Sequence, residues 1–215
     1  DIRIEGDDQA QQDIRSMLYH LYSFVRPGSN LSPSPMGLSG LGYNGHVFWD
    51  TELWMYPPLL LLQPEMAKSM IQYRFDRLNA AKRNAFNHGF KGAMFPWESA
   101  GSGVEETPVW ALSGPFEHHI TACVGFAAWN YYLVTQDKGW LKEIGWPLLK
   151  ETADLSQINI EFSQGDNKLK FPFWNHLNGP MADAIWHCGQ VVTNRRASGN
   201  PLNSKVNVFL GKTMP

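Results

Sequence analysis

The chain has 215 residues, of which 43% are hydrophobic and 18% charged, so its composition is that of a globular protein and excludes a disordered one. The formal net charge of −2 excludes the strongly basic surface typical of nucleic-acid binding and the polybasic run that targets a membrane. No run of about 18 apolar residues is present, so we expect no transmembrane helix.

The two cysteines, Cys123 and Cys188, form no CxxC pair and have no histidine at ligand spacing. We therefore expect neither a disulfide nor a metal site, and we expect Cys123 to be a small buried hydrophobic residue. No secretory signal is visible, and the first residue is Asp1 rather than Met. The localisation of the parent protein stays open between the cytoplasm and export.

The first predicted element is an amphipathic helix over residues 9–25. Apolar side chains recur there at helical spacing, namely at Ile14, Met17, Leu18, Leu21, Tyr22 and Val25. Residues 26–30 are breakers that end the helix. Residues 27–46 are rich in Gly, Pro and Ser and are predicted to form a long loop, and long ordered loops in compact domains are usually functional.

Two more helices are predicted before residue 90. A short apolar helix covers residues 52–62 and is interrupted at Pro57 and Pro58. The next begins at Pro64, which suits a first helical turn, and stops at Gly89, which suits the position after a helix. Its apolar stripe consists of Ala67, Met70, Ile71, Leu78, Ala81 and Ala85.

Residues 89–117 are predicted to form a second long loop, followed by two more helical regions. Residues 118–135 are apolar almost throughout, so this helix is expected to be buried on all sides. Residues 140–155 complete a fifth helical region, with Pro147 near a helix start. Helices that alternate with long polar loops predict a helical barrel whose loops build a pocket at one end.

The pattern changes after residue 155, where Gly, Pro and Asn become frequent and no helical period survives. We therefore divide the chain into a helical region, 1–155, and a divergent, poorly structured tail, 156–215. The fold class expected is all-α with an irregular C-terminal tail.

Two loop segments place aromatic rings beside carboxylates. The first, 42–52, contains Trp49, Asp50 and Glu52, and the second, 95–99, contains Trp97 and Glu98. Aromatic faces stack on the apolar face of a pyranose, and carboxylates accept hydrogen bonds from its hydroxyls, so both segments predict a sugar pocket. The alternatives are that the tryptophans belong to the core, and that Asp50 or Glu52 is an ion-pair partner of Arg74 or an acid at a helix N-terminus.

Four separated blocks of this sequence resemble glycoside hydrolase family 65. They are Gly-Leu-Ser-Gly-Leu-Gly-Tyr-Asn-Gly-His-Val-Phe-Trp-Asp-Thr-Glu at 37–52, Tyr73-Arg74 with Leu78 and Ala81, Gly-Ala-Met-Phe-Pro-Trp-Glu-Ser at 92–99, and His-His-Ile-Thr at 118–121. The resemblance covers 1–155 and implies an (α/α)6 barrel, normally preceded by a β-sandwich. The five or so helices predicted here correspond to the first half of such a catalytic domain.

The resemblance also implies roles for particular residues. Asp50 would accept hydrogen bonds from a terminal glucose while Trp49 packs against its ring, and Trp97, Glu98 and His119 would border the same pocket. Two neighbouring groups have plainer interpretations, because Glu105 and Glu106 fit a solvated loop and His118 fits a polar residue at a helix start.

The proton-donating glutamate of the family, in a Gly-Pro-Asp-Glu-Tyr segment, has no clear counterpart. Gly179-Pro180 is followed by Met181-Ala182, and the nearest acid, Asp183, is the candidate that remains. We interpret the tail as a reading-frame change or artificial end near residue 155. An incomplete copy would expose inner helix faces, which favours self-association.

The sequence thus predicts an α-glucoside hydrolase that releases terminal glucose by inversion, acting on trehalose-like or glucosyl-disaccharide substrates. Inversion uses one carboxyl group as acid and another as base for water. One alternative is an inverting disaccharide phosphorylase, and another is a non-catalytic carbohydrate-binding or degenerate fragment. The resemblance implies no cofactor and no metal, and apart from the sugar substrate we expect neither a nucleic-acid nor a membrane partner.

Overall fold

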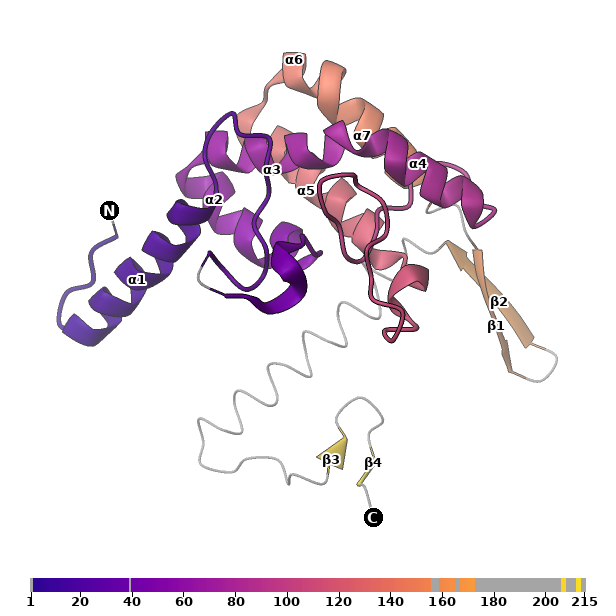
Figure 1. Ribbon diagram of the computed structural model, residues 1–215, viewed down its shortest axis with the longest axis horizontal. Coiled ribbons are helices and arrows are strands. Elements are labelled where there is room, and N and C mark those ends of the chain that lie inside the picture. Colours follow the sequence, from indigo (N-terminus) through magenta and orange to yellow (C-terminus); the bar gives the residue numbers. More distant parts are fainter. Residues whose placement is uncertain are drawn as a thin grey trace. The chain divides into compact units, whose positions relative to one another are not determined.

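The computed structural model describes residues 2–38 and 40–155 in full and, beyond them, the backbone of four strands at 159–164, 167–172, 206–207 and 212–213 (Figure 1). Contacts within the chain divide it into two units, Asp1–Ser156 and Gln157–Pro215. The first unit is helical and contains all of the side chains considered below. In the described part of the chain, no helix is long and apolar enough to cross a membrane.

The predicted N-terminal helix is present as α1, Asp8–Phe24. It begins where the Asp7 carboxylate accepts a hydrogen bond from the Ala10 N–H at 2.9 Å, and it ends at Val25, whose backbone is extended. No residue of α1 is fully buried, and its apolar face is covered only near its C-terminal end, where Leu21 and Phe24 pack against the core. Figure 1 shows the N-terminal part of α1 extending away from the other helices.

The second helical region is continuous rather than interrupted. A π-helical turn, Thr51–Met55, runs directly into α2, Tyr56–Leu62. Pro57 and Pro58 fall in the first turn of α2, the part of an α-helix that tolerates proline best. The expected interruption at these prolines was therefore wrong, because they mark the start of α2.

The long helix predicted after Pro64 forms two helices, α3 (Pro64–Asp76) and α4 (Leu78–Asn87). They are separated at Arg77, whose backbone (φ −104°, ψ 8°) leaves the helical range. Gly89 follows α4 with φ of +79°, so the predicted stop is confirmed.

The apolar helix at 118–135 is α5, His119–Thr135, and it packs against α2, α3 and α7. Its inward face, which includes Ile120 and Val124, is fully buried. On the outward face Phe126 is 44% exposed and Trp129 46% exposed, so the expectation of burial on all sides was wrong. The described neighbours of α5 bury residues 120–125 on every side, whereas Phe126, Trp129, Leu133 and Val134 further along are exposed.

The fifth helical region consists of α6 (Lys138–Trp140), a π-helical turn (Leu141–Gly145) and α7 (Trp146–Leu155). The Asp137 carboxylate caps this region by accepting from the Trp140 N–H at 2.9 Å. The core between α2, α3, α5 and α7 is made of buried apolar side chains, among them Leu59, Leu60, Ala67, Met70, Ile71, Ile120, Val124, Ala127, Tyr131 and Leu148.

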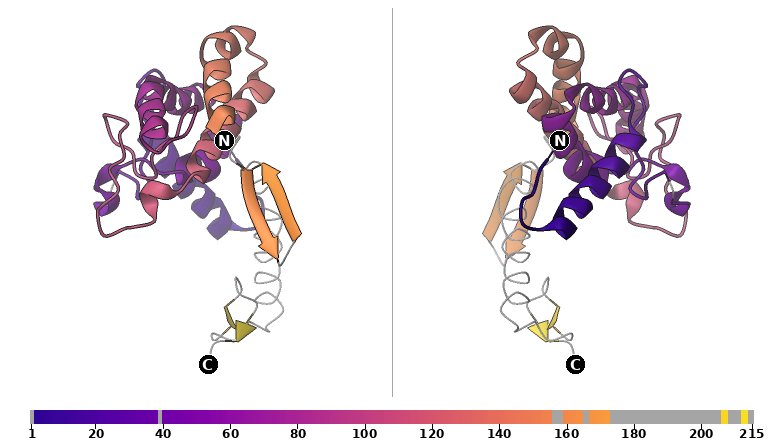
Figure 2. Two further views of the ribbon diagram at one scale, coloured as in Figure 1. Left: turned by 90° about the vertical axis from the view of Figure 1, so that its right-hand side faces the viewer. Right: turned by 90° about the vertical axis from the view of Figure 1, so that its left-hand side faces the viewer.

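The second unit contains two antiparallel strand pairs. β1 (Asn159–Gln164) pairs with β2 (Asn167–Pro172) in a hairpin whose register runs from Asn159↔Pro172 to Gln164↔Asn167, visible as orange arrows in Figure 2. β3 (Val206–Asn207) pairs with β4 (Lys212–Thr213). The residue pattern did not indicate the β1–β2 hairpin. Gly179-Pro180, Asp183 and Cys188 lie outside the described residues.

Candidate functional site

The two aromatic and acidic loop segments lie side by side. Val47 and Ser99 form an antiparallel bridge in which the Val47 N–H donates to the Ser99 carbonyl at 2.8 Å and the Ser99 N–H donates back at 2.9 Å. A ring contact adds to this bridge, because Phe48 meets Trp97 edge to face with ring centroids 5.3 Å apart. Segments far apart in the sequence thus form one structural feature, as a shared pocket requires.

Trp49 connects this feature to the start of α5. Its ring is half-buried and lies edge to face with His119, at a centroid distance of 5.1 Å. The ring of Trp54 also lies near Trp49, with a centroid distance of 6.3 Å. Trp49 and His119 are therefore in direct contact, whereas Trp97 and Glu98 are connected to them through Phe48 and Val47.

Asp50 is half-buried at the start of the π-helical turn but does not cap it, because its side chain makes no hydrogen bond there. Among the described residues, its carboxylate has neither a hydrogen-bond partner nor an ion-pair partner. Asp50 is close enough to His119 for its negative charge to act on the imidazole. A carboxylate in this position keeps its lone pairs available for a ligand.

His119 is an uncharged imidazole at neutral pH. Burial lowers its pKa below the ordinary value, and the nearby carboxylates of Glu117 and Asp50 only partly offset this effect. Glu117 is the closer carboxylate, with its Oε2 3.2 Å from Nδ1 of His119. His118, at the start of α5 as predicted, also has a lowered pKa, first through burial and then through the charges of His88 and His119.

Glu52 forms an ion pair with Arg74, so this interpretation of Glu52 is confirmed. Arg74 Nε donates to Oε1 at 2.6 Å and Nη2 donates to Oε2 at 2.9 Å, while Nη2 also reaches the Phe48 carbonyl at 3.3 Å. Burial by itself would lower the pKa of Arg74, but the charge and hydrogen bonds of Glu52 outweigh it and raise the pKa. The pair is fully buried. Through Glu52 and the Phe48 carbonyl, it attaches the end of segment 42–52 to Arg74 of α3.

Glu98 is buried and makes a specific contact with the first segment. Its Oε1 lies 2.9 Å from Nδ1 of His46, and the side chain of Glu98 is only 3% exposed. An ionised carboxylate only accepts hydrogen bonds, so Nδ1 of His46 carries the proton. His46 was not among the predicted site residues, although it precedes Trp49 in the same motif.

Glu105 organises the second segment, so the expected solvated loop was the wrong interpretation for it. Its carboxylate accepts hydrogen bonds from the backbone N–H groups of Trp97 at 3.0 Å, Glu98 at 3.2 Å and Thr107 at 3.2 Å, and from the Thr107 hydroxyl at 2.5 Å. Glu106 is exposed and bonds only Ser102 through its side chain, so the solvated interpretation holds there.

Gly114 fixes the position of the Trp97 ring. A Cβ atom at this position would lie 2.5 Å from Cε3 of Trp97 and 2.6 Å from Cγ2 of Thr107. Only glycine therefore lets the loop before α5 pack this closely on the ring. Together with Phe48 and Glu105, Gly114 holds Trp97 in one orientation.

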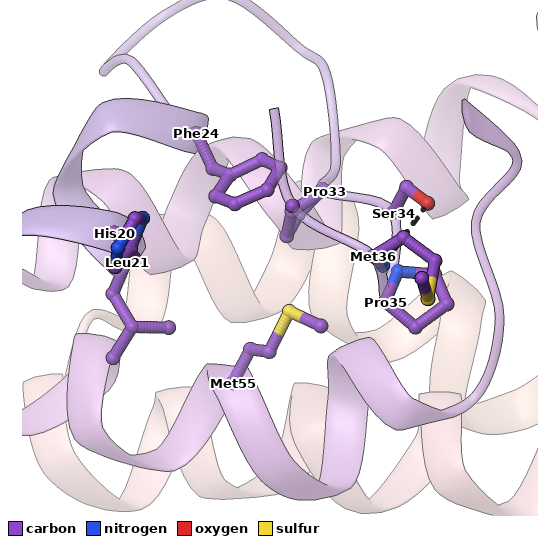
Figure 3. A pocket seen from close by; sticks show the side chains of 9 residues that line it. His20, Leu21, Phe24, Pro33, Ser34, Pro35, Met36 and Met55 are labelled. Atoms are coloured by element: carbon purple, nitrogen blue, oxygen red, sulfur yellow. Dashed lines mark hydrogen bonds between the residues drawn. The ribbon is translucent and has the colours of Figure 1, made fainter. Parts of the chain in front are cut away.

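A cavity of about 260 Å³ lies elsewhere in the helical unit, between α1 and the proline-rich loop. Figure 3 shows Phe24, Pro33 and Met55 around it. None of the five predicted site residues lines this cavity, and its walls are mostly apolar, so it is not the predicted sugar pocket. It separates the apolar end of α1 from the loop that follows.

Cys123 is buried in α5, as predicted, and burial raises the pKa of its thiol to about 12. A thiol with this pKa is protonated at neutral pH and is a poor nucleophile. No group of histidine, cysteine, aspartate and glutamate side chains suited to a metal ion occurs in the described part of the chain.

Residues 15–172 match the model of the glycosyl hydrolase family 65 central catalytic domain. The chain belongs to glycosyl hydrolase family 65. The match includes β1 and β2, so the family-like sequence extends beyond residue 155, where the resemblance of the helical blocks ends.

Named relatives in the family include both hydrolases and phosphorylases. A kojibiose hydrolase from Flavobacterium johnsoniae is 67% identical over 171 residues, which are 79% of this chain and 25% of that protein. A kojibiose phosphorylase from Caldanaerobacter subterraneus subsp. tengcongensis is 44% identical over 191 residues, covering 84% of this chain and 24% of that protein. The chain spans about a quarter of the length of the curated relatives it matches.

A solved structure supports the same assignment. The putative kojibiose phosphorylase from human microbiome superposes with a TM-score of 0.67 at 27% identity, over 76% of this chain and 24% of that chain. The predicted fold class, a partial (α/α)6 barrel built from the helices of 1–155, is thereby confirmed.

Proposed function

We propose that this chain forms the glucose-binding part of a family 65 enzyme that hydrolyses α-glucosides with inversion and releases a terminal glucose. The observation that carries the proposal is the unpaired carboxylate of Asp50, in a loop that the second aromatic and acidic loop joins at Val47 and Phe48. Its carboxylate lies beside Trp49 and His119 and has no hydrogen-bond partner among the described residues. An unpaired, half-buried carboxylate is stabilised when a ligand donates hydrogen bonds to it.

Each predicted site residue has a role in this proposal. Asp50 accepts hydrogen bonds from glucose hydroxyls, and Trp49 supplies an apolar surface for the pyranose ring. His119, uncharged at neutral pH, offers a hydrogen-bonding nitrogen rather than a fixed positive charge. Trp97 and Glu98 border the pocket from the second loop, where Glu105 fixes their backbone.

Hydrolysis is favoured over phosphorolysis by the pattern of identities. Kojibiose hydrolases from Flavobacterium johnsoniae and Mucilaginibacter mallensis are 67% and 68% identical to this chain, whereas the kojibiose phosphorylase from Caldanaerobacter is 44% identical. We therefore propose kojibiose as the substrate and water as the acceptor of the glucosyl group. The phosphorylase is the second candidate, supported by its relatives and by the superposed structure.

The acid and base that inversion requires are not assigned to the described carboxylates of the two loops. Glu52 is neutralised by Arg74, Glu98 is bonded to His46, and Glu105 is occupied by backbone donors. Asp183 is the remaining candidate acid, and it lies outside the described residues.

The test uses the full chain with kojibiose, with and without inorganic phosphate. Titration calorimetry measures binding, and the products are assayed as free glucose and as glucose 1-phosphate. We expect kojibiose to bind and Asp50→Ala to weaken binding at least tenfold, because one charged hydrogen bond contributes about 1.5–3 kcal/mol. Glu106→Gln, on an exposed carboxylate, is the matched control and should bind as the unchanged chain does.

The products separate the alternatives. Free glucose without phosphate supports the hydrolase, and glucose 1-phosphate formed only with phosphate supports the phosphorylase. Binding without either product supports the non-catalytic interpretation, while a rate that Asp183→Asn abolishes would rule that interpretation out. Absence of binding, or equal binding by Asp50→Ala, would overturn the proposed site.

A further inference from the structure

The contact between His46 and Glu98 joins the two loops through their side chains. The two residues are 52 positions apart, and Oε1 of Glu98 lies 2.9 Å from Nδ1 of His46. The bridge between Val47 and Ser99, the residues that follow each of them, sets their backbones side by side. The pair is thus formed by tertiary structure, between loops that the backbone bridge places side by side.

The surroundings of Glu98 leave its carboxylate dependent on His46. The Glu98 backbone is fixed on both sides, because its N–H donates to Glu105 and its carbonyl accepts from the Glu106 N–H at 3.0 Å. His46 is the hydrogen-bond partner that the described residues provide for the carboxylate itself. A buried carboxylate with one donor has its plane set by that donor, and its second oxygen, Oε2, is left to accept from a ligand.

His46 differs from Glu98 in exposure. Its side chain is 21% exposed, whereas that of Glu98 is 3% exposed. Only a small part of the Glu98 carboxylate is therefore open to a ligand. The direction in which Oε2 points then decides whether a sugar hydroxyl meets a lone pair, because hydrogen bonds weaken steeply away from linear geometry.

We propose that His46 is a positioning residue for sugar binding. Its Nδ1–H holds Oε1 of Glu98, so that Oε2 is preset to accept a hydrogen bond from a hydroxyl of the glucoside. This inference rests on the proposed function. It adds a residue that acts through Glu98 to the carboxylates and rings that contact the sugar.

Three substitutions of His46 separate positioning from simple loss of structure. In His46→Asn, the amide nitrogen takes a place close to that of Nδ1 and retains the donor. In His46→Gln the amide nitrogen lies one carbon further out, and in His46→Leu there is no donor. His20→Leu, on the exposed face of α1, is the control for loss of a histidine outside the two loops.

The expected order of kojibiose affinity, measured by calorimetry on the full chain, follows from the donor position. His46→Asn should bind within about threefold of the unchanged chain, while His46→Leu and His46→Gln should bind at least about tenfold more weakly. Thermal unfolding of each variant identifies any that fail to fold. Equal affinity for all three variants, or equal loss in all three, would overturn the positioning role.

A second measurement needs no sugar. Nitrogen-15 NMR of the histidine side chains reports which ring nitrogen carries the proton, and His46→Asn identifies the His46 signals among those of the seven histidines. We expect the protonated nitrogen to be Nδ1 and its proton to exchange slowly. A neutral ring protonated only at Nε2 would overturn the hydrogen bond to Glu98.

The two failures are distinguishable. If the unchanged chain binds no kojibiose, the proposed function fails and the positioning role fails with it. If the unchanged chain binds but His46→Leu binds equally well, the proposed function stands and only the role of His46 is overturned.

Discussion

Helices are usually expected to be better fixed than loops, but in this chain the two paired loops are held by more tertiary contacts than α1. Segment 42–52 and the loop 95–107, which contains the second segment, have little regular secondary structure, yet polar contacts fix them at His46–Glu98, Glu52–Arg74 and Glu105. α1 is a regular helix, yet none of its residues is fully buried. Regular backbone geometry and tertiary restraint are thus separate properties, and in this chain the restraint is concentrated in the loops that carry the candidate site.

The largest effect is expected at the buried ion pair beneath the first loop. Arg74→Met leaves the Glu52 carboxylate buried without a partner, which costs about 3–5 kcal/mol in the free energy of unfolding. Urea unfolding measures this loss. Lys82→Met, which breaks a surface pair with Glu151 (3.1 Å) whose lysine is 46% exposed, is the control and should cost less than about 1 kcal/mol. Equal costs for the two variants would contradict the comparison.

The next effect is expected at the second loop. Glu105→Ala removes the acceptor of three backbone N–H groups and one hydroxyl, and unsatisfied buried donors cost about 1–3 kcal/mol. Chemical unfolding should show this loss, and kojibiose binding should weaken because Trp97 and Glu98 are no longer fixed. Glu106→Ala, on the exposed neighbour, should change neither. Unaltered stability of Glu105→Ala would show that the loop is held by other contacts.

A smaller and more local effect is expected in α1. Asp7→Ala removes the side chain that caps the helix, a change that typically costs about 1 kcal/mol of helix stability. Because α1 is weakly packed, amide hydrogen exchange should accelerate in its first turns and stay unchanged in α5. Slower kojibiose binding, or a loss of about 1 kcal/mol in the free energy of global unfolding, would mean that α1 is coupled to the site.

A dependence on pH is expected at the start of α5. Burial lowers the pKa of His119 and His118 in the folded chain, so the unfolded chain binds protons more readily at these positions. Keeping these histidines neutral contributes to the free energy of unfolding. This contribution is fully present above the unfolded pKa of about 6.5 and is lost as the pH falls below it. Chemical unfolding at pH 7.5 and at pH 5.5 measures this loss of stability. The difference between the two pH values should be smaller in His119→Asn. An equal difference in the variant and the unchanged chain would contradict the role of His119.

The smallest effect on stability is expected on the outward face of α5, where Phe126 and Trp129 are exposed. Changing both to serine should alter the free energy of unfolding by less than about 0.5 kcal/mol for each residue. We propose that this apolar face promotes self-association, so the double variant should sediment with a lower average mass than the unchanged chain. An unchanged sedimentation profile would argue against this role.

Local signals in the sequence were sufficient for several helix ends, but they did not indicate the break at Arg77 that separates α3 from α4. The apolar period at 9–25, Pro64 at a helix start and Gly89 after a helix all correspond to observed boundaries. These signals depend on backbone conformation and on neighbours within one or two turns, which the sequence contains directly. The family resemblance likewise needed only short motifs, and it led to the fold class and to the five candidate site residues.

Tertiary structure decided what each polar residue does. Asp50 and Glu52 look alike in the sequence, but only Glu52 meets Arg74, and Asp50 is left with its carboxylate unpaired in the described part of the chain. Glu105 and Glu106 are adjacent, yet one is an acceptor for the loop backbone and the other is exposed. Which partner a side chain meets depends on segments far away in the sequence. Local propensity therefore determined where most helices form. Long-range packing determined which partner each carboxylate meets and which residues of α5 stay exposed.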